Sequence, residues 1–488
     1  MIKRLLKDSV IYTIPTVLSK GIQIILLPFY TRLLEPSVYG ANDIIVILTL
    51  YAQSFLTLEI HQAVARFYPA ENDFQKKVAI SSTGLYFIII IYLIFLMLAL
   101  PASALVARIL FGSARYSVLV RFAFIAMVCN GLFNYLQSQL RWDLRSLDYS
   151  IASIIFIIVS TIFTFYSIII LKLGGLSVFI GQIAGSLCGS VFSFLKNKKV
   201  FRFVFSRKTL KEMLKFSSPL FVSTWLVLTA SYIDRFFIMK DLSLDGVGVY
   251  GVAAKFSSIV SILFVGFNMA ITPLIYAKCE SETLPYEIER LFSLFVPVVG
   301  FLSCLIFIFS REILLLFTSS AYHSGLWVMP LLVLSNIIAN LYLFTPGLSI
   351  RKNNKPIILI SLAGVITNIT LNALLVPKFG INGSALASVA SAVCMFVLHF
   401  IFSQHYYYIP FKFKPIISSV IFILFSSIVS IFLDKLKLNI MLILLIKSIY
   451  VISVWLLTLN VNKNMIEFTK SASSFLSQMI FKNARKEN

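Results

Sequence analysis

The stretch FIIIIYLIFLMLAL, residues Phe87–Leu100, decides the fold because it is apolar on every side of a helix. Ile151–Ile170 is a second stretch of the same character. A strand of a membrane barrel alternates apolar and polar residues over about ten positions, so these stretches exclude a barrel. Of the 488 residues, 59% are hydrophobic and 13% are charged, and the mean hydropathy is +0.92. We therefore predict an all-α polytopic membrane protein.

Apolar runs of this kind return along the whole chain, separated by short polar joints. A helix needs about 20 apolar residues to cross a hydrocarbon core of roughly 30 Å. On that criterion the sequence predicts about 14 transmembrane helices. They are expected at 10–31, 41–62, 78–100, 117–139, 149–171, 175–195, 216–238, 247–276, 288–309, 325–347, 356–376, 381–402, 414–433 and 438–460.

The chain contains an internal repeat with an offset of about 206 residues. The offset superposes Asn130 on Asn336, Asn134 on Asn340, Arg145 on Arg351, Lys172 on Lys378, and Gly174 on Gly380. LLKDS at 5–9 also aligns with MLKFS at 213–217, and the pair Tyr39-Gly40 returns as Tyr250-Gly251. Chance alignment is the alternative, but intramembrane asparagines and loop glycines align less easily than leucines. Each half holds six spans, so the halves are expected to be related by a pseudo-two-fold axis along the membrane normal.

The repeat divides the chain into five predicted parts. They are an N-terminal six-helix lobe at 1–196, a basic cytoplasmic linker with an interfacial helix at 197–215, a C-terminal six-helix lobe at 216–404, two extra helices at 405–462, and a cytoplasmic tail at 463–488.

Basic residues predict the orientation. Assigning alternate joints to alternate sides places about 28 of the 42 Lys and Arg residues on the side of the N-terminus and about 11 on the other. Both termini are therefore expected in the cytoplasm. The net charge of +22 gathers at the membrane face, where anionic lipid headgroups attract it, and no nucleic-acid partner is expected. Pro15 and Lys20 interrupt the first apolar run and no cleavage site follows, which indicates an uncleaved first span.

Motifs for metal, redox or ATP chemistry are absent from the sequence. No Walker-type phosphate loop occurs, so we expect no ATP hydrolysis. The histidines have no metal-ligand spacing, and the cysteines show no close pairing and are expected to be small apolar fillers. The residues concerned are His61, His323, His399, His405, Cys129, Cys188, Cys279, Cys304 and Cys394. We therefore expect no cofactor, no metal and no enzyme active site.

Polar residues follow one stripe on each of four predicted helices, at spacings typical of a single helix face. The stripes consist of Ser9, Thr13, Thr16, Lys20, Gln23 and Tyr30 on the first helix, Asp43, Gln53, Thr57 and His61 on the second, Ser217, Thr224, Ser231 and Arg235 on the seventh, and Ser257, Ser261, Asn268 and Thr272 on the eighth. Lys255 lies about 100° from the last stripe. These four helices are expected to share a polar interior.

Lys20 lies near the middle of its span, where a charge costs at least ~2.5 kcal/mol unless water or a counter-charge receives it. Either it pairs with Asp43 or Asp234 or snorkels to the interface, or it lines a pathway for an anionic solute. The same two explanations apply to Lys255, which is expected nearer the outer face of the membrane.

Charged residues at the span ends have two explanations each. Arg32, Arg66, Arg141 and Arg235 either anchor their helices at the interface or contact the solute. Asp43 and Asp234 either carry a coupling proton or sodium ion or pair with a nearby base. For the repeated asparagines we favour hydrogen bonds between helices over a role in transport.

Three segments resemble motifs of bacterial polysaccharide repeat-unit (O-antigen) flippases of the Wzx type, in the multidrug/oligosaccharidyl-lipid/polysaccharide exporter superfamily. LLPFYTRLLEPSVYG, Leu26–Gly40, resembles the signature of the first loop. Asp234-Arg235-Phe236 resembles the motif that ends the seventh helix. NITLNALLVPKFGINGSALAS, Asn368–Ser388, resembles the pattern between helices eleven and twelve.

The resemblance implies two six-helix lobes facing each other as a V, with helices one, two, seven and eight nearest a central cavity. It implies a carrier that moves an undecaprenyl-pyrophosphate-linked oligosaccharide to the outer leaflet of the inner membrane by alternating access, driven by an ion gradient. Lys20, Gln23, Arg235 and Lys255 would then bind the substrate, and Arg32 and Arg66 would guard the mouths of the cavity. The two extra helices would help to form a side opening for the prenyl tail. A polysaccharide polymerase and a chain-length regulator are the expected protein partners.

Two other functions compete with this one. A multidrug exporter of the same superfamily would share the fold but would need acidic cavity residues for cationic drugs, and the chain is basic. A membrane enzyme such as a repeat-unit polymerase would more often carry a long external loop, and every predicted outer joint is short.

Overall fold

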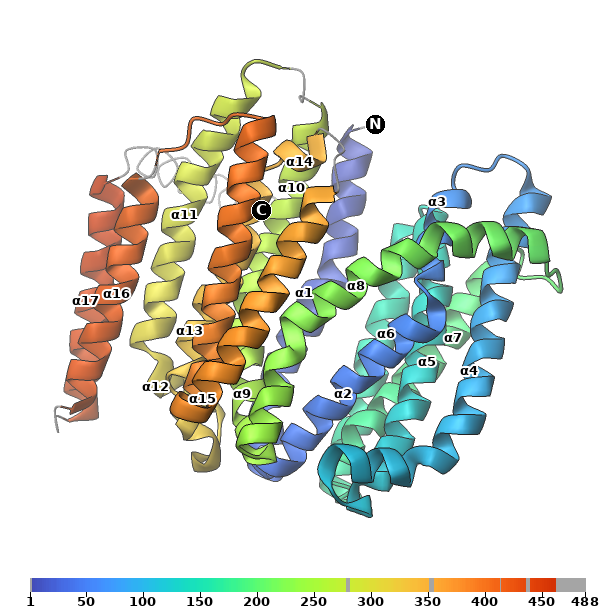
Figure 1. Ribbon diagram of the computed structural model, residues 1–488, viewed down its shortest axis with the longest axis horizontal. Helices are drawn as coiled ribbons and strands as arrows, with labels where there is room; N and C mark the ends of the chain where they lie inside the picture. The colour runs from blue at the N-terminus through green and yellow to red at the C-terminus, as the bar shows by residue number, and fades with distance from the viewer. Residues whose placement is uncertain (1, 278–280, 351–354, 413, 436–438, 462–488) are drawn as a thin grey trace, which may run out of the picture. The chain divides into compact units, whose positions relative to one another are not determined.

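The computed structural model describes residues 2–277, 281–350, 355–412, 414–435 and 439–461, and every regular element in these ranges is a helix (Figure 1). The prediction of an all-α polytopic membrane protein is confirmed. Each of the predicted ranges falls on one or more helices. Arg351, Cys279 and the tail 463–488 lie outside the described residues.

The chain divides into two compact units. The first comprises residues 1–252 and 368–384, and the second comprises 253–367 and 385–488. The helices that begin in the first unit are α1 (Ile2–Leu33), α2 (Pro36–Thr57), α3 (Ile60–Phe67), α4 (Phe74–Phe111), η1 (Ala114–Tyr116), α5 (Ser117–Trp142), α6 (Ser146–Phe165), η2 (Tyr166–Ile170), α7 (Leu176–Asn197), α8 (Arg207–Asp241) and α9 (Leu244–Ser257).

The helices that begin in the second unit are α10 (Ile259–Ala277), α11 (Leu284–Ile308), α12 (Ser310–Phe317), η3 (Ser320–Gly325), α13 (Val328–Asn340), η4 (Leu341–Phe344), α14 (Gly347–Ile350), α15 (Lys355–Tyr406), α16 (Lys414–Lys435) and α17 (Ile440–Val461).

Nine helices of the described chain are long and apolar enough to cross a membrane, and the bent pair α2 and α3 makes a tenth if it is one span. The count of about 14 spans is therefore not confirmed by length and hydropathy. One reason is that Pro356–Tyr406 counts as a single span. Gly380 interrupts it with φ 62° and ψ −143°, a conformation open to glycine, and the two predicted helices 356–376 and 381–402 meet at this break.

The exposed apolar side chains of α4 indicate that lipid surrounds part of this helix. Met97, Leu98 and Ile109 are 75%, 69% and 73% exposed, although they belong to the helix with the most apolar 18-residue stretch among the described spans. Ile88 and Tyr92 of the same helix are buried in the core of the first unit. One side of α4 therefore contacts protein and the other is suited only to lipid.

Glycines let α6 and α7 approach closely within the first unit. A Cβ on Gly185 would lie 2.6 Å from the carbonyl oxygen of Phe156, and a Cβ on Gly181 would lie 2.5 Å from that of Ser160. Packing of small residues substitutes for the hydrophobic effect where lipid surrounds the helices.

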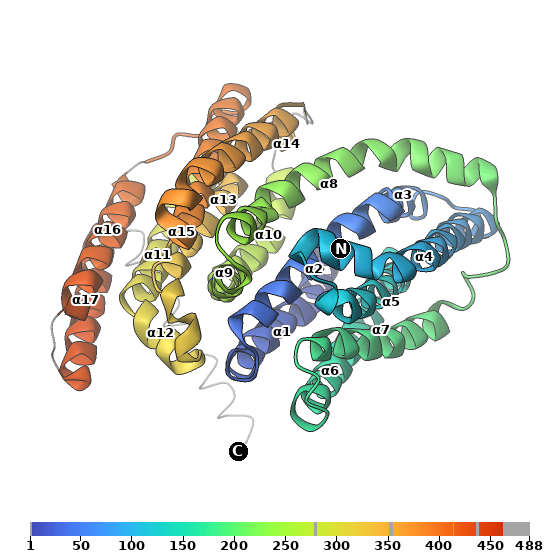
Figure 2. The same cartoon turned by 60° about the horizontal axis from the view of Figure 1, so that its bottom comes forward.

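Two hydroxyls of α4 fix the chain between α7 and α8. Ser82 Oγ donates to the carbonyl of Val200 at 3.2 Å and accepts from the amide of Arg202 at 3.0 Å. Thr83 Oγ1 accepts from the amide of Ser206 at 3.1 Å, and Ser206 in turn caps α8. The interfacial helix expected in 197–215 is thus the first turns of α8 itself, which continues without interruption into the predicted span 216–238. Figure 2 shows α8 passing along α2 and α3, against which it packs.

The predicted span 41–62 is broken where α2 ends. Leu58 and Glu59 adopt left-handed backbone conformations, with φ of 45° and 57°, and α3 leaves α2 at an angle of 52°. Each such residue costs about 1–2 kcal/mol relative to the right-handed helix. The break allows Ile60 and Val64 of α3 to enter the core between α4, α5 and α8.

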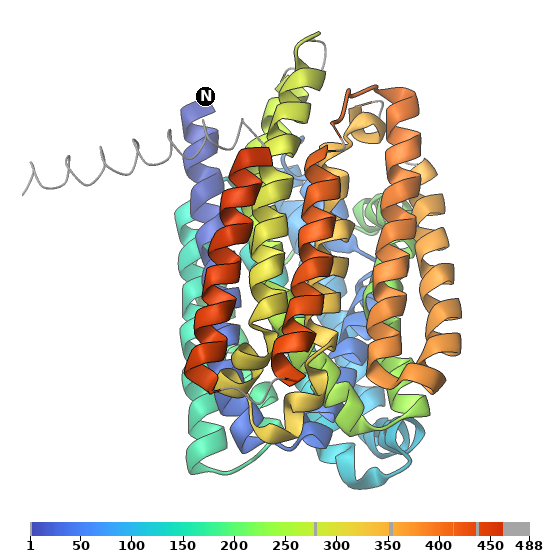
Figure 3. The same ribbon diagram turned by 90° about the vertical axis from the view of Figure 1, so that its left-hand side faces the viewer.

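The extra helices α16 and α17 pack against α11 in the second unit (Figure 3). Lys447 of α17 is completely buried, and its ammonium group lies 2.8 and 3.0 Å from the two carboxylate oxygens of Glu312 on α12. A buried ammonium requires such a partner, since its desolvation costs several kcal/mol. This ion pair ties α17 to the rest of its unit.

We predict that Lys447→Met destabilises the protein by about 3–5 kcal/mol, because it leaves the Glu312 carboxylate without its partner. The melting temperature of the purified protein in detergent measures this loss. The double variant Lys447→Met/Glu312→Gln should recover most of it, and Lys240→Met, at an exposed lysine, should leave it unchanged. Equal melting temperatures for Lys447→Met and wild type would show that the pair does not stabilise the fold.

Candidate functional site

The two tyrosine-glycine pairs of the repeat meet in the first unit, where α2 packs against the start of α9. A Cβ on Gly40 would lie 2.1 Å from the carbonyl oxygen of Leu244, and a Cβ on Gly248 would lie 2.0 Å from that of Pro36. Only glycine fits at either position. At Gly251 a Cβ would meet the carboxylate of Asp43 at 3.1 Å and the ring of Tyr39 at 3.4 Å. Close backbone contact therefore places Asp43 beside α9.

Arg235 of α8 connects the acidic residues of this region. Its Nη1 donates to both carboxylate oxygens of Asp234, at 2.8 and 2.9 Å, and to the carbonyl of Ser231 at 3.1 Å. Its Nε donates to Oδ2 of Asp43 on α2 at 3.4 Å. The guanidinium is thus held by two carboxylates from two helices.

Two aromatic rings complete the arrangement. The guanidinium carbon of Arg235 lies 5.3 Å from the ring centroid of Tyr232 and 5.0 Å from that of Tyr250, within the range of a cation–π interaction. Tyr250 also donates its hydroxyl to Oδ2 of Asp234 at 2.6 Å. We call Asp43, Asp234, Arg235, Tyr232 and Tyr250 the acidic cluster.

The acidic cluster combines two carboxylates with one guanidinium. The side chains of Asp234 and Arg235 are 6% and 10% exposed, whereas the Asp43 side chain is 19% exposed. One negative charge is left over within these five side chains, in a region where uncompensated charge is costly. The arrangement is suited to bind one proton or one monovalent cation, with Asp43 as the more accessible carboxylate.

The other predicted site residues lie outside the acidic cluster. Lys20 is half-buried on α1, and Gln23, Arg32 and Arg66 are exposed. Lys255 is half-buried and belongs to the second unit. The carboxylates proposed as ion-pair partners of Lys20 are bound to Arg235 instead. The roles of all these residues in substrate binding stay predictions.

The repeated asparagines differ between the two halves. Asn336 donates to Ser257 Oγ at 2.9 Å and so connects α13 to α9 within the second unit. Asn134 bonds to Asn130 of its own helix, and its side chain is exposed. A hydrogen bond between helices thus accounts for Asn336.

The late motif of Asn368–Ser388 has a structural explanation. Asn372 is completely buried and donates to Oδ1 of Asn368 at 2.7 Å, while its own Oδ1 accepts from Ser384 at 2.7 Å. These bonds hold together the two parts of α15 on either side of Gly380.

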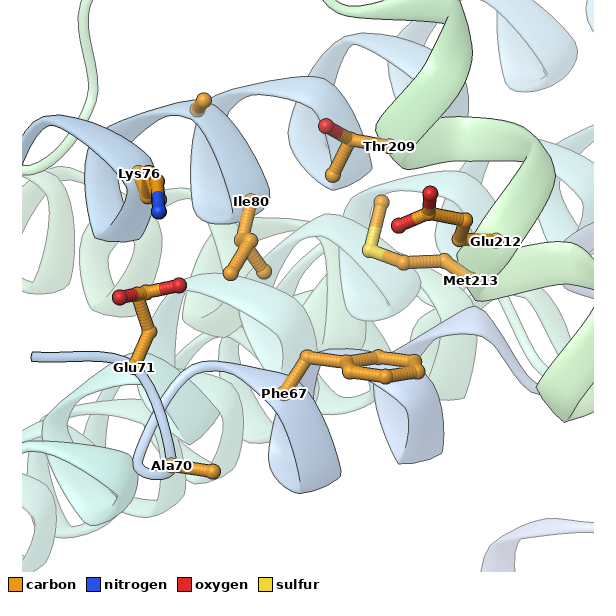
Figure 4. Close-up of a pocket in the computed structure, with 9 residues that line it drawn as sticks. Phe67, Ala70, Glu71, Lys76, Ile80, Thr209, Glu212 and Met213 are labelled. Atoms are coloured by element: carbon orange, nitrogen blue, oxygen red, sulfur yellow. The ribbon is translucent and has the colours of Figure 1, made fainter. Parts of the chain in front are cut away.

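A cavity of about 280 Å³ lies where the end of α3, the start of α4 and the start of α8 come together (Figure 4). Its charged lining residues are Glu71, Lys76 and Glu212, and Phe67 and Met213 supply apolar surface. Backbone amides of Asp73 and Asn72 bond to the Glu71 carboxylate and hold its pKa below the usual range. No residue of this cavity was among the predicted site residues.

Sequence reasoning identified three of the five cluster residues. It missed Tyr232 and Tyr250 as members, although Tyr250 belongs to the repeated tyrosine-glycine pair. The signal was present, because a Tyr-Gly pair that returns in both halves indicates a close helix contact. The pattern could not show that the two copies of the pair touch.

Comparison with known proteins identifies the family to which the chain is related. A family model described as "Polysaccharide biosynthesis protein" matches residues 5–277, which is more than half of the chain. The Lsg locus putative protein 1 of Haemophilus influenzae (strain ATCC 51907 / DSM 11121 / KW20 / Rd) is 24% identical over 302 residues, covering 60% of this chain and 71% of that protein.

Two solved structures share the fold. A lipid II flippase MurJ in an inward closed conformation superposes with a TM-score of 0.66 at 18% identity, covering 92% of this chain and 98% of that one. An inward-facing multidrug resistance MATE family transporter of the MOP superfamily gives a TM-score of 0.62 at 16% identity, covering 82% and 97%. The resemblance to a polysaccharide family is thereby confirmed, and the chain belongs to the polysaccharide biosynthesis protein family.

Proposed function

We propose that this protein is a flippase that moves lipid-linked oligosaccharide repeat units across the bacterial inner membrane for surface polysaccharide synthesis. One observation carries the proposal. The chain matches a polysaccharide biosynthesis family, while its fold is that of a lipid II flippase and of multidrug transporters. A membrane-spanning carrier fold in a polysaccharide family is suited to moving the precursor rather than building it.

The proposed substrate is an undecaprenyl-pyrophosphate-linked oligosaccharide of the O-antigen type. A sugar chain with a diphosphate cannot cross hydrocarbon alone, because each unsatisfied polar group costs several kcal/mol. Lys20, half-buried on α1, is the candidate ligand for the diphosphate. Arg235 is held by two carboxylates in this structure, so its binding of a diphosphate would require a change of partner.

The acidic cluster is the proposed site of ion coupling. Two carboxylates share one guanidinium, so the cluster can take up a proton or sodium ion without losing the Arg235 pairing. Uptake and release of that ion would bias the carrier between its two access states. The transport cycle would then run on an ion gradient, with both termini in the cytoplasm.

Export of multidrug-type cations is the second candidate, because the fold is shared with a multidrug transporter. The net charge of +22 and the basic candidates Lys20 and Lys255 fit an anionic substrate better.

Deletion of the gene tests the substrate. We expect lipid-linked repeat units to accumulate facing the cytoplasm and surface polysaccharide to be lost, with recovery on complementation. Normal surface polysaccharide in the deletion strain, together with altered resistance to cationic drugs, would favour the second candidate.

In the complemented strain we predict that Lys20→Ala lowers transport at least about tenfold, the loss expected for a charge-assisted hydrogen bond to phosphate. Lys20→Arg should restore most of it, and Lys240→Ala should behave as wild type. Immunoblots of the membranes check that the variants insert at normal levels. Full transport by Lys20→Ala would remove this residue from the site.

We further predict that Asp43→Asn and Asp234→Asn each abolish the dependence of transport on the proton or sodium gradient. Either change leaves Arg235 with one carboxylate and so removes the surplus negative charge while keeping an ion pair. Asp245→Asn, at an exposed position on α9, is the matched control. Unchanged gradient dependence in both cluster variants would place coupling elsewhere.

A further inference from the structure

The break between α2 and α3 carries a second titratable site, separate from the acidic cluster. Leu58 and Glu59 both have positive φ, although neither is a glycine. Consecutive left-handed residues persist only where surrounding contacts hold them. The side chains around Glu59 supply these contacts.

Glu59 is a buried carboxylate, with 8% of its side chain exposed. Its Oε1 accepts a hydrogen bond from Ser54 Oγ at 3.1 Å, and its Oε2 lies 3.3 Å from Nε2 of His61. The His61 side chain is 41% exposed, so its ring is accessible while the carboxylate stays covered. A buried acid in contact with an accessible imidazole is suited to exchange one proton with the solvent.

Among the charged groups on the neighbouring helices, one acts directly on this pair. Helix α5 brings Arg141, whose charge acts on the His61 ring, and Asp143, which accepts from the Tyr68 hydroxyl at 2.6 Å. The charged groups that α4 and α8 bring near this pair lie toward the end of α3. They are Lys77 of α4, stacked on the Tyr68 ring, and Lys76 of α4 and Glu212 of α8, which line the cavity at Phe67.

We propose that Glu59 and His61 form a proton-binding site that holds the α2–α3 break. A proton taken up from water gives His61 an N–H on both ring nitrogens, and the Nε2–H group donates to Oε2 of Glu59. Release returns the proton to water and leaves a buried carboxylate with only neutral donors. The charged form stabilises the left-handed pair, and loss of the proton loosens the joint.

Hydrogen exchange of the purified full-length protein tests this site without any transported substrate. Peptides covering 54–66 should exchange about tenfold faster at pH 8 than at pH 5.5, after correction for intrinsic rates, because a charge-assisted bond is lost. Glu59→Gln and His61→Gln should abolish this difference. His405→Gln changes an exposed histidine and Glu71→Gln a half-buried carboxylate outside the pair, and both should retain it.

Protection of peptides from α5 and α7 shows whether each variant is folded. If a variant does not fold, wild type labelled with ¹⁵N-histidine provides a second measurement, in which the ring of His61 should change its protonation state with pH. Exchange in 54–66 that does not depend on pH in wild type, or a pH response that survives in folded His61→Gln, would overturn the proposal. These results are independent of what the protein transports.

Discussion

The structure depends on one constraint, which is that every charged side chain buried away from water needs a partner of opposite charge. An ion inside the hydrocarbon region is tolerated only with a partner, since desolvation costs several kcal/mol. Lys447 meets Glu312, and Arg235 meets Asp234 and Asp43. The charges of Lys447 and Glu312 cancel, whereas Arg235, Asp234 and Asp43 together leave one negative charge over. A balanced pair fastens helices together, and an unbalanced group offers a place for a mobile ion.

Helix contacts make the unbalanced group possible. Gly40 and Gly248 bring α2 and α9 into backbone contact, which places Asp43 within reach of the Arg235 side chain on α8. The two copies of a repeated Tyr-Gly pair thus join to position one site. A substitution at either glycine would separate the helices before it affected any charge.

The sequence predicted the helical class and the positions of the long apolar helices, because apolar runs of this length suit a membrane, and its predicted spans 356–376 and 381–402 leave a break at Gly380. It also singled out Asp43, Asp234 and Arg235. It did not reveal that Arg235 is enclosed by carboxylates, since that depends on contacts between residues nearly 200 positions apart. The break at Leu58 and Glu59 was also missed, because no glycine or proline marks it and buried contacts alone hold these residues. The hydroxyls of α4 that fix residues 200–206 leave no pattern in the sequence either.

In the proposed cycle, an ion gradient acting on the acidic cluster drives translocation of a lipid-linked oligosaccharide. The most direct measurement uses purified protein in liposomes that contain undecaprenyl-diphosphate-linked repeat units extracted from the deletion strain. Exposure of the sugar at the opposite leaflet is followed with and without a proton or sodium gradient. The account predicts gradient-dependent exposure that requires the protein. Exposure at the same rate without a gradient, or none in either condition with folded protein, would contradict it.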